Sequence, residues 1–208
     1  MKQFGRALVA CVVTGVAALV LAAPAQAGLL VKSAEDCAAE PQPAKVFKPW
    51  LDFANYIPAP GGAAESADGW KLERGARIVA GNAPWKVGNA SDSNSLLLPR
   101  GSSATTDVMC VGVEYPTLRF FAKRTGGTLL STLLIEVEFE GLGGILKSLP
   151  VGVVVGGSQW QPTLPHIVLA SLLPLLPGQR TPVRFKFTPL GGGSWNIDDI
   201  YVDPWRAR

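Results

Sequence analysis

Few residues in this chain of 208 have the types and spacing that acid–base catalysis needs. His166 is the only histidine, and it stands in an apolar, strand-like run. A general base needs an orienting partner and a cleft, and the residues around His166 indicate neither. The sequence also lacks the Gly-x-Ser-x-Gly pattern of a nucleophilic serine. We therefore expect no catalytic residue and predict that the protein is not an enzyme.

Acidic pairs are the remaining catalytic option, because two carboxylates across a cleft can hydrolyse a glycosidic bond. The acids that could form such a pair are Glu136, Glu138, Glu140, Asp198 and Asp199. The three glutamates alternate with apolar residues, which is typical of the solvent-facing side of a strand. A glycoside-acting hydrolase is therefore the least favoured interpretation.

Aromatic residues give the best indication of a binding function. Trp85 and Trp160 stand in turn-rich stretches, and Gln159 and Gln161 flank the second of them. Ligand sites combine apolar walls with a few fixed polar groups. We predict that these four residues bind a glycan or another extracytoplasmic polymer. The alternative is that both indoles only cover the ends of the fold, because tryptophan is usually substantially buried.

The first 27 residues have the features of a secretory signal. Lys2 and Arg6 precede an uncharged apolar stretch over 7–23, and Ala25-Gln26-Ala27 is a small-x-small cleavage pattern. We predict cleavage before Gly28, export from the cell, and no membrane insertion once the signal is removed. The alternative is an uncleaved membrane anchor, since the apolar stretch is about as long as a short spanning helix.

Removal of residues 1–27 leaves 17 basic and 16 acidic residues, a net charge of +1 on 181 residues. A chain so close to neutrality has no basic patch of the kind that binds nucleic acid. We therefore expect no nucleic-acid partner.

Two cysteines, Cys37 and Cys110, remain after the signal and its Cys11 are removed. An even pair in an oxidising compartment favours a disulfide. The alternative is two free or metal-bound thiols, but a zinc site would need more cysteine or histidine ligands than this chain offers.

Glycine and proline, 23 and 17 residues, interrupt the whole chain and favour short strands over long helices. Three segments alternate apolar and polar residues with the period of a half-buried strand. The predicted strands are 71–79, 95–98, 108–113, 118–122, 133–139, 151–155, 166–170, 183–187 and 196–202. Their number and length predict an all-β fold, an antiparallel β-sandwich of the jelly-roll type. We expect the glutamates of 133–139 to pair with Arg184 and Lys186 across neighbouring strands.

The predicted organisation has one folded domain. Residues 1–27 are the signal peptide, 28–60 an irregular N-terminal arm packed on the domain, 61–204 the β-sandwich and 205–208 a short tail. We expect Trp50, Phe53 and Tyr56 to dock the arm, and Trp70 and Trp195 to fill the core.

Two stretches resemble the first and last strands of galactose-binding-like jelly rolls, the fold of many carbohydrate-binding modules. They are Gly61 to Glu65 followed by Gly69-Trp70, and Trp195 to Val202 with its Asp198-Asp199 pair. The layout is also similar to secreted bacterial proteins of this fold that have no assigned function. The resemblance implies a structural calcium ion held by Glu65 and by Asp198 or Asp199, and calcium does take carboxylate and carbonyl oxygens. The alternative is that these acids only accept hydrogen bonds from loop amides or pair with arginines.

The sequence therefore predicts a secreted, non-catalytic binding module whose partner is a glycan or another extracellular polymer. The rival class is a structural or protein-interaction component of the cell exterior. A contiguous apolar patch in place of a polar-lined groove would favour that rival.

Overall fold

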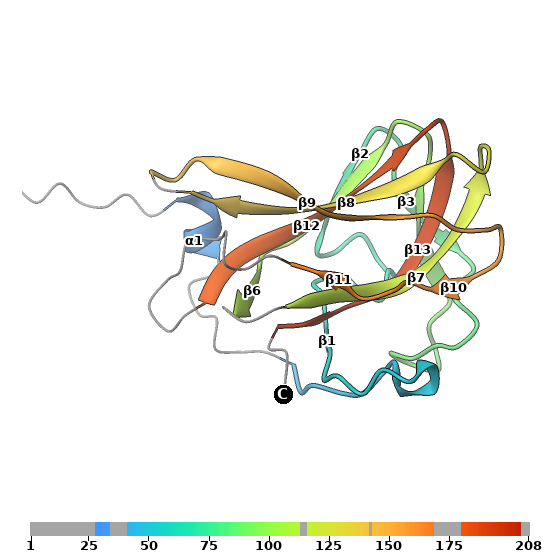
Figure 1. Cartoon of the computed structure of the whole chain (residues 1–208), viewed down its shortest axis with the longest axis horizontal. Coiled ribbons are helices and arrows are strands. Elements are labelled where there is room, and N and C mark those ends of the chain that lie inside the picture. Colours follow the sequence, from blue (N-terminus) through green and yellow to red (C-terminus); the bar gives the residue numbers. More distant parts are fainter. Residues whose placement is uncertain (1–27, 34–40, 113–115, 142, 169–179, 205–208) are drawn as a thin grey trace, which may run out of the picture.

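The computed structural model describes residues 28–33, 41–112, 116–141, 143–168 and 180–204 (Figure 1). The predicted signal peptide, Cys37 and the C-terminal tail lie outside the described residues. Two short helical segments precede the sheets, α1 at Leu29–Ser33 and the 3-10 turn η1 at Lys48–Trp50. Within the described ranges, no helix is long and apolar enough to cross a bilayer.

One layer is a seven-stranded antiparallel sheet in the order β10-β7-β13-β4-β3, with β1 beside β13 and β11 beside β7. Its strands are β1 (Ile57–Pro58), β3 (Arg77–Ala80), β4 (Asn94–Leu98), β7 (Thr117–Gly126), β10 (Gln161–Pro162), β11 (His166–Ile167) and β13 (Ser194–Asp203).

The other layer is a six-stranded antiparallel sheet in the order β2-β5-β12-β8-β9, with β6 beside β12. Its strands are β2 (Trp70–Glu73), β5 (Ser103–Thr106), β6 (Met109–Gly112), β8 (Thr132–Glu140), β9 (Leu146–Val154) and β12 (Arg180–Leu190). Figure 1 shows β8, β9 and β12 in one layer and β7, β11 and β13 in the other. The predicted fold class, an antiparallel β-sandwich, is confirmed.

The core lies between the two sheets and follows from period-two alternation. Every second residue of β8 and β12 faces inward and is at most 3% exposed: Leu133, Ile135, Val137, Phe139, Val183, Phe185 and Phe187. Trp195 is fully buried and Trp70 is 9% exposed, as their strand patterns predict. Each such side chain contributes about 1.5–3 kcal/mol through removal of its apolar area from water.

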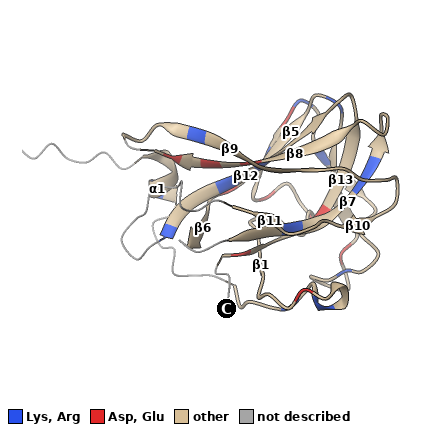
Figure 2. Ribbon diagram, in the orientation of Figure 1, with Lys and Arg blue, Asp and Glu red and all other residues tan. Residues whose placement is uncertain are grey.

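The outward face of the six-stranded sheet carries the predicted charge pairing. Arg184 lies opposite Glu138 and Lys186 opposite Glu136 on the neighbouring strand. The Nζ of Lys186 is 3.7 Å from an Oε atom of Glu138, the diagonal neighbour. Figure 2 shows the basic positions of β12 beside the acidic ones of β8. Such exposed pairs fix the register of the strands more than they stabilise them.

Two details of the fold differ from the sequence predictions. Residues 71–79, predicted as one strand, form β2 and β3, which belong to different sheets. The chain turns between them at Arg74 and Gly75, which both have positive φ, 51° and 91°. The strand β5 was missed because its side chains are small and polar, yet all four of its residues are buried.

Candidate ligand-binding surface

The candidate site lies on the outer face of the seven-stranded sheet, where β7 presents Arg119, Phe121 and Lys123 on alternate positions. Phe121 is fully buried there, because a second apolar cluster outside the main core covers it. This cluster contains Phe47, Tyr56, Ala83, Phe121 and Tyr201. The arm that carries η1 and β1 and the loop after β3 therefore pack on this face (Figure 1).

Trp85, from the loop after β3, forms the exposed surface of this cluster. Its ring stacks on Phe121 with 4.9 Å between centroids and 28° between planes. Trp50, at the end of η1, meets Trp85 edge-on at 5.3 Å and Phe121 at 5.2 Å. Trp85 nevertheless remains 41% exposed, so part of its ring is accessible to a ligand.

Trp160 packs against the same cluster just before β10. The Nζ of Lys123 lies 4.7 Å from the centre of its ring, a cation–π contact that fixes the indole beside β7. The structure thus brings Trp85 and Trp160, far apart in the sequence, to one aromatic platform made of Trp50, Trp85, Phe121, Trp160 and Lys123. No ligand role was predicted from the sequence for Trp50, Phe121 or Lys123, although an aromatic residue on the polar side of the 118–122 alternation is a usable signal.

The two predicted glutamines do not share one location. Gln159 is exposed beside Trp160, whereas Gln161 pairs with Ala122 across β10 and β7. Because Ala122 faces the space between the sheets, Gln161 faces it as well. Gln161 and Ala122 both line a cavity of about 310 Å³ at the open edge of the sandwich, together with Val154 and His166.

His166 has no catalytic surroundings in this cavity. Its ring stacks on Phe120 at 6.1 Å, its Nε2 has no hydrogen-bond partner, and burial lowers its pKa. The described residues that line the cavity include no carboxylate. A general base is oriented by a partner such as a carboxylate, and the described residues that line this cavity offer His166 none.

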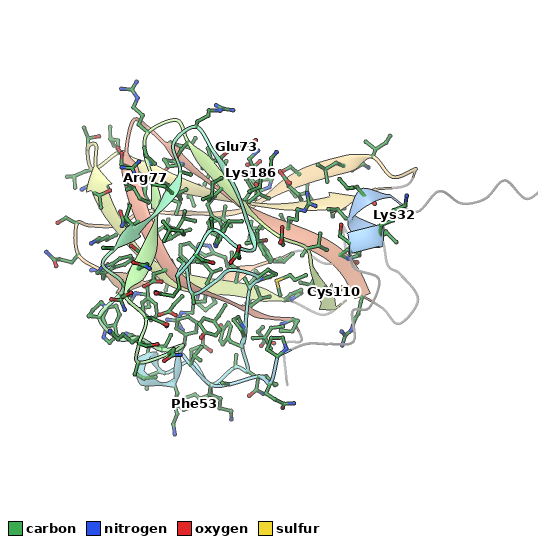
Figure 3. All side chains as sticks on the ribbon, turned by 180° about the vertical axis from the view of Figure 1, so that it is seen from behind. Lys32, Phe53, Glu73, Arg77, Cys110 and Lys186 are labelled. Carbon is green, nitrogen blue, oxygen red and sulfur yellow. The ribbon has the colours of Figure 1, made fainter. Side chains whose placement is uncertain are left out.

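Arg119 anchors the arm beneath the platform. Its guanidinium donates to Asp52 at 2.6 Å and to the carbonyl of Thr163 at 2.8 Å, and it lies 4.6 Å from the centre of the Phe47 ring. Burial alone would raise the pKa of Asp52, but hydrogen bonds from Tyr56, Ala54 and Arg119 outweigh it and hold this pKa below its usual value. Tyr56 and Trp50 dock the arm as predicted, whereas the prediction for Phe53 is wrong, because its side chain is 57% exposed (Figure 3).

The predicted metal-binding acids surround the loop between β3 and β4. Asp198 is 1% exposed and accepts hydrogen bonds from the backbone N–H groups of Ala83, at 2.6 Å, and Asp199, at 2.9 Å. Asp199 is equally buried, and neither of its Oδ atoms has a hydrogen bond of good geometry. A Cβ atom built on Gly88 would lie 3.1 Å from Asp199 Oδ1 and 3.2 Å from Asp92 Oδ2. Asp92, which lies on the same side of Gly88 as Asp199, was not among the acids predicted from the sequence.

The protonation of these acids follows from their burial. Burial, together with the charges of Asp199 and Asp92, raises the pKa of Asp198 to about 8. Burial and the charges of Asp92 and Glu65 raise the pKa of Asp199 to about 6, although the backbone N–H groups of Val87 and Gly88 face it and partly offset the rise.

Glu65 ties the turn before β2 to the start of β4. Its carboxylate accepts hydrogen bonds from the backbone N–H groups of Ser93 at 2.8 Å and Asn94 at 2.9 Å. Those bonds outweigh the effect of burial and lower the pKa of Glu65. Among the described residues, no three Asp, Glu, His or Cys side chains are grouped closely enough to hold a metal ion on their own. An ion at Asp199 would therefore need backbone carbonyl oxygens as well, a donor set that calcium accepts.

Comparisons with known proteins give similar structures only. No protein-family profile matches the chain, and no curated protein sequence matches it. Among solved structures, the CBM22-1 xylan-binding domain of Paenibacillus barcinonensis Xyn10C is similar, with 14% identity and a TM-score of 0.48 over 71% of this chain and 94% of that domain. The C-terminal family 22 carbohydrate-binding module of Clostridium thermocellum Xyn10B has 16% identity and a TM-score of 0.47, over 70% of this chain and 94% of the module. TmCBM61, solved with β-1,4-galactotriose, has 15% identity and a TM-score of 0.40, over 71% of this chain and 95% of that one. The resemblance to carbohydrate-binding modules is thus a resemblance of fold.

Proposed function

We propose that the chain is an exported, non-catalytic protein that binds a glycan at the aromatic platform. The observation that carries the proposal is the partly exposed ring of Trp85, which packs against Phe121 and Trp50 beside the cluster that Trp160 also contacts. Flat aromatic surfaces of this kind match the apolar C–H faces of sugar rings, while polar side chains such as Gln159 bind hydroxyl groups.

The polar groups of the platform favour an uncharged polysaccharide. The ammonium of Lys123 already lies over the ring of Trp160, and Lys86, which follows Trp85, donates its Nζ hydrogen to the carbonyl of Ala90. A ligand that stacks on Trp85 would therefore be recognised by apolar contact and hydroxyl hydrogen bonds rather than by charge. Binding of this type persists at high salt, because screening weakens only charge–charge attraction.

The test is retention on insoluble polysaccharides and retardation in gels that contain soluble ones. Trp85→Ala and Trp160→Ala are expected to reduce retention at least tenfold. Phe53→Ala is the matched control, because Phe53 is an exposed aromatic residue of the N-terminal arm and lies outside the platform. Absence of retention on any glycan, or equal retention of the platform variants and the control, would contradict the proposal.

A structural or protein-interaction role is the second candidate, and one observation favours it. Apolar side chains gather at the rim of the edge cavity, where Val153, Val155 and Leu164 are 51%, 71% and 80% exposed. If this rim is the functional surface, Val155→Ser with Leu164→Ser abolishes association with other envelope proteins and leaves glycan retention unchanged. Association that both substitutions leave intact would exclude the rim as the contact.

We also propose that a structural calcium ion binds at Asp199, one of the two aspartates predicted as alternatives beside Glu65, and that Asp92 and backbone carbonyl oxygens complete its ligands. The support is the buried carboxylate of Asp199, whose oxygens lack well-formed hydrogen bonds. Calcium at a hundredfold excess over its dissociation constant would stabilise the fold by about 2.7 kcal/mol. Thermal unfolding with calcium and with a chelator measures the effect, and Asp199→Asn should abolish it. Unfolding that is identical under both conditions would exclude the ion.

A further inference from the structure

Glu140, the last residue of β8, has a buried carboxylate in which only one of the two oxygens accepts a hydrogen bond. The residue is 9% exposed, and its Oε1 accepts a hydrogen bond from the backbone N–H of Leu30 at 2.6 Å. Its Oε2 is buried and has no hydrogen-bond partner. No salt bridge joins this carboxylate to a described lysine or arginine. A buried charge without a partner is costly, and within the described ranges no group donates a hydrogen bond to Oε2.

Gly28, at the start of α1, lies directly against that carboxyl group. A Cβ atom added to Gly28 would overlap the carboxyl group of Glu140, so a residue without a side chain is needed for this approach. The first turn of α1 starts here, because the N–H of Lys32 donates to the carbonyl of Gly28 at 3.1 Å. Figure 3 shows Lys32 on α1 beside the ends of the long strands, and α1 contacts both β8 and β12.

We propose that cleavage of the chain before Gly28 creates the missing donor, so that the new α-ammonium group of Gly28 forms an ion pair with Oε2 of Glu140. A signal peptidase of the export pathway catalyses the hydrolysis. Water adds across the Ala27–Gly28 peptide bond, Ala27 leaves with a carboxylate, and the amine of Gly28 takes up a proton. Glu140 then holds the N-terminal segment through both carboxylate oxygens: Oε2 pairs with the α-ammonium group of Gly28, and Oε1 accepts the hydrogen bond from the N–H of Leu30.

The ion pair depends on the positive charge of the Gly28 amine, which exists only after the chain is cleaved. Before cleavage, the nitrogen of Gly28 is a neutral amide with a single proton. After cleavage it carries a full positive charge and three protons, and charge-assisted hydrogen bonds are about twice as strong as neutral ones. The mature protein is therefore more stable than any form that retains even one extra residue. The inference rests on the proposed export, but not on the proposed glycan.

The test compares two forms of the oxidised mature chain, released from a fusion partner so that the first residue is either Gly28 or Ala27. Urea unfolding is expected to give an unfolding equilibrium constant about tenfold larger for the form that begins at Ala27, in line with a hydrogen bond to a charged group. Acetylation of the Gly28 amine should produce the same loss without adding a residue. In Glu140→Gln the difference between the two forms should disappear.

Glu136→Gln is the matched control, because Glu136 lies on the same strand face and bonds only to Ser148 among the described residues. The difference between the two forms should persist in that variant. Equal stability of the two forms, or a difference that survives Glu140→Gln, would overturn the ion pair. N-terminal sequencing of the exported protein provides the separate check: a first residue other than Gly28 refutes the processing site, whatever the result of the glycan experiments.

Discussion

Trp160 and Gln161 are consecutive in the chain but face opposite sides of the seven-stranded sheet. Trp160 lies on the outer face under the ammonium of Lys123, while Gln161 lies opposite Ala122 and lines the cavity between the sheets. The cause is the period of two in an extended chain. A ligand on the aromatic platform therefore reaches Gln159 and Trp160 but not Gln161.

Because the two glutamines lie on different sides of the sheet, their substitutions should have different effects on glycan retention. Gln159→Ala is expected to weaken glycan retention about threefold, the effect of one hydrogen bond of about 0.7 kcal/mol. Gln161→Ala should leave retention unchanged, because its side chain is on the other side of the sheet. Affinity gel electrophoresis of the two variants beside the unmodified protein measures both. A larger loss in Gln161→Ala than in Gln159→Ala would place the ligand in the edge cavity instead.

The alternating strands could be predicted from the sequence because burial and exposure alternate within β8 and β12 themselves. Strand β5 could not, since its small polar residues are buried only by the packing of neighbouring strands. The same limit applies to the candidate site. Trp85 and Trp160 could be selected by type, but their proximity depends on the arm and on Phe121, which are distant in sequence. Asp92 was missed because its role depends on the course of the loop around Gly88.

Arg119→Met is expected to destabilise the protein by about 3 kcal/mol. The substitution leaves the half-buried Asp52 without its charged partner and removes the donor to Thr163, and each hydrogen-bonding group left unsatisfied in a buried setting costs about 1–3 kcal/mol. Urea unfolding followed by tryptophan fluorescence measures the change. Arg184→Met, on the outward face of the other sheet, is the control and should cost less than about 1 kcal/mol. Similar losses in both variants would show that Arg119 does not anchor the arm.

The raised pKa values of Asp198 and Asp199 predict that the protein without bound calcium becomes less stable as the pH rises. Both carboxyl groups have folded-state pKa values, about 8 and about 6, above the ordinary value of 3.8. A raised folded-state pKa means that the stability is fully present below the unfolded pKa and is lost as the pH rises through the folded value. Stability should therefore fall between about pH 4 and pH 8. Thermal unfolding in chelator across this range measures it.

Asp199→Asn tests the assignment of that slope. The neutral amide removes one of the two buried charges and also lowers the repulsion that Asp198 experiences. The fall in stability between pH 4 and pH 6 should be smaller in the variant, whereas Asp68→Asn, an exposed acid on the turn before β2, should leave it unchanged. A slope that Asp199→Asn does not alter would mean that the buried pair is not its source.

The Cys37–Cys110 disulfide stays a prediction, because Cys37 lies outside the described residues. Cys110 is in β6, 7% exposed and opposite Pro182 of β12, so a disulfide there would tie the N-terminal arm to a strand that pairs only with β12 in the six-stranded sheet. Reduction, or Cys37→Ser, is expected to lower the free energy of unfolding by about 4 kcal/mol in the chain-entropy treatment of a loop of this length. Mass spectrometry of the exported protein under non-reducing conditions should show a loss of two hydrogens relative to the reduced chain. Two free thiols in that spectrum would refute the pairing.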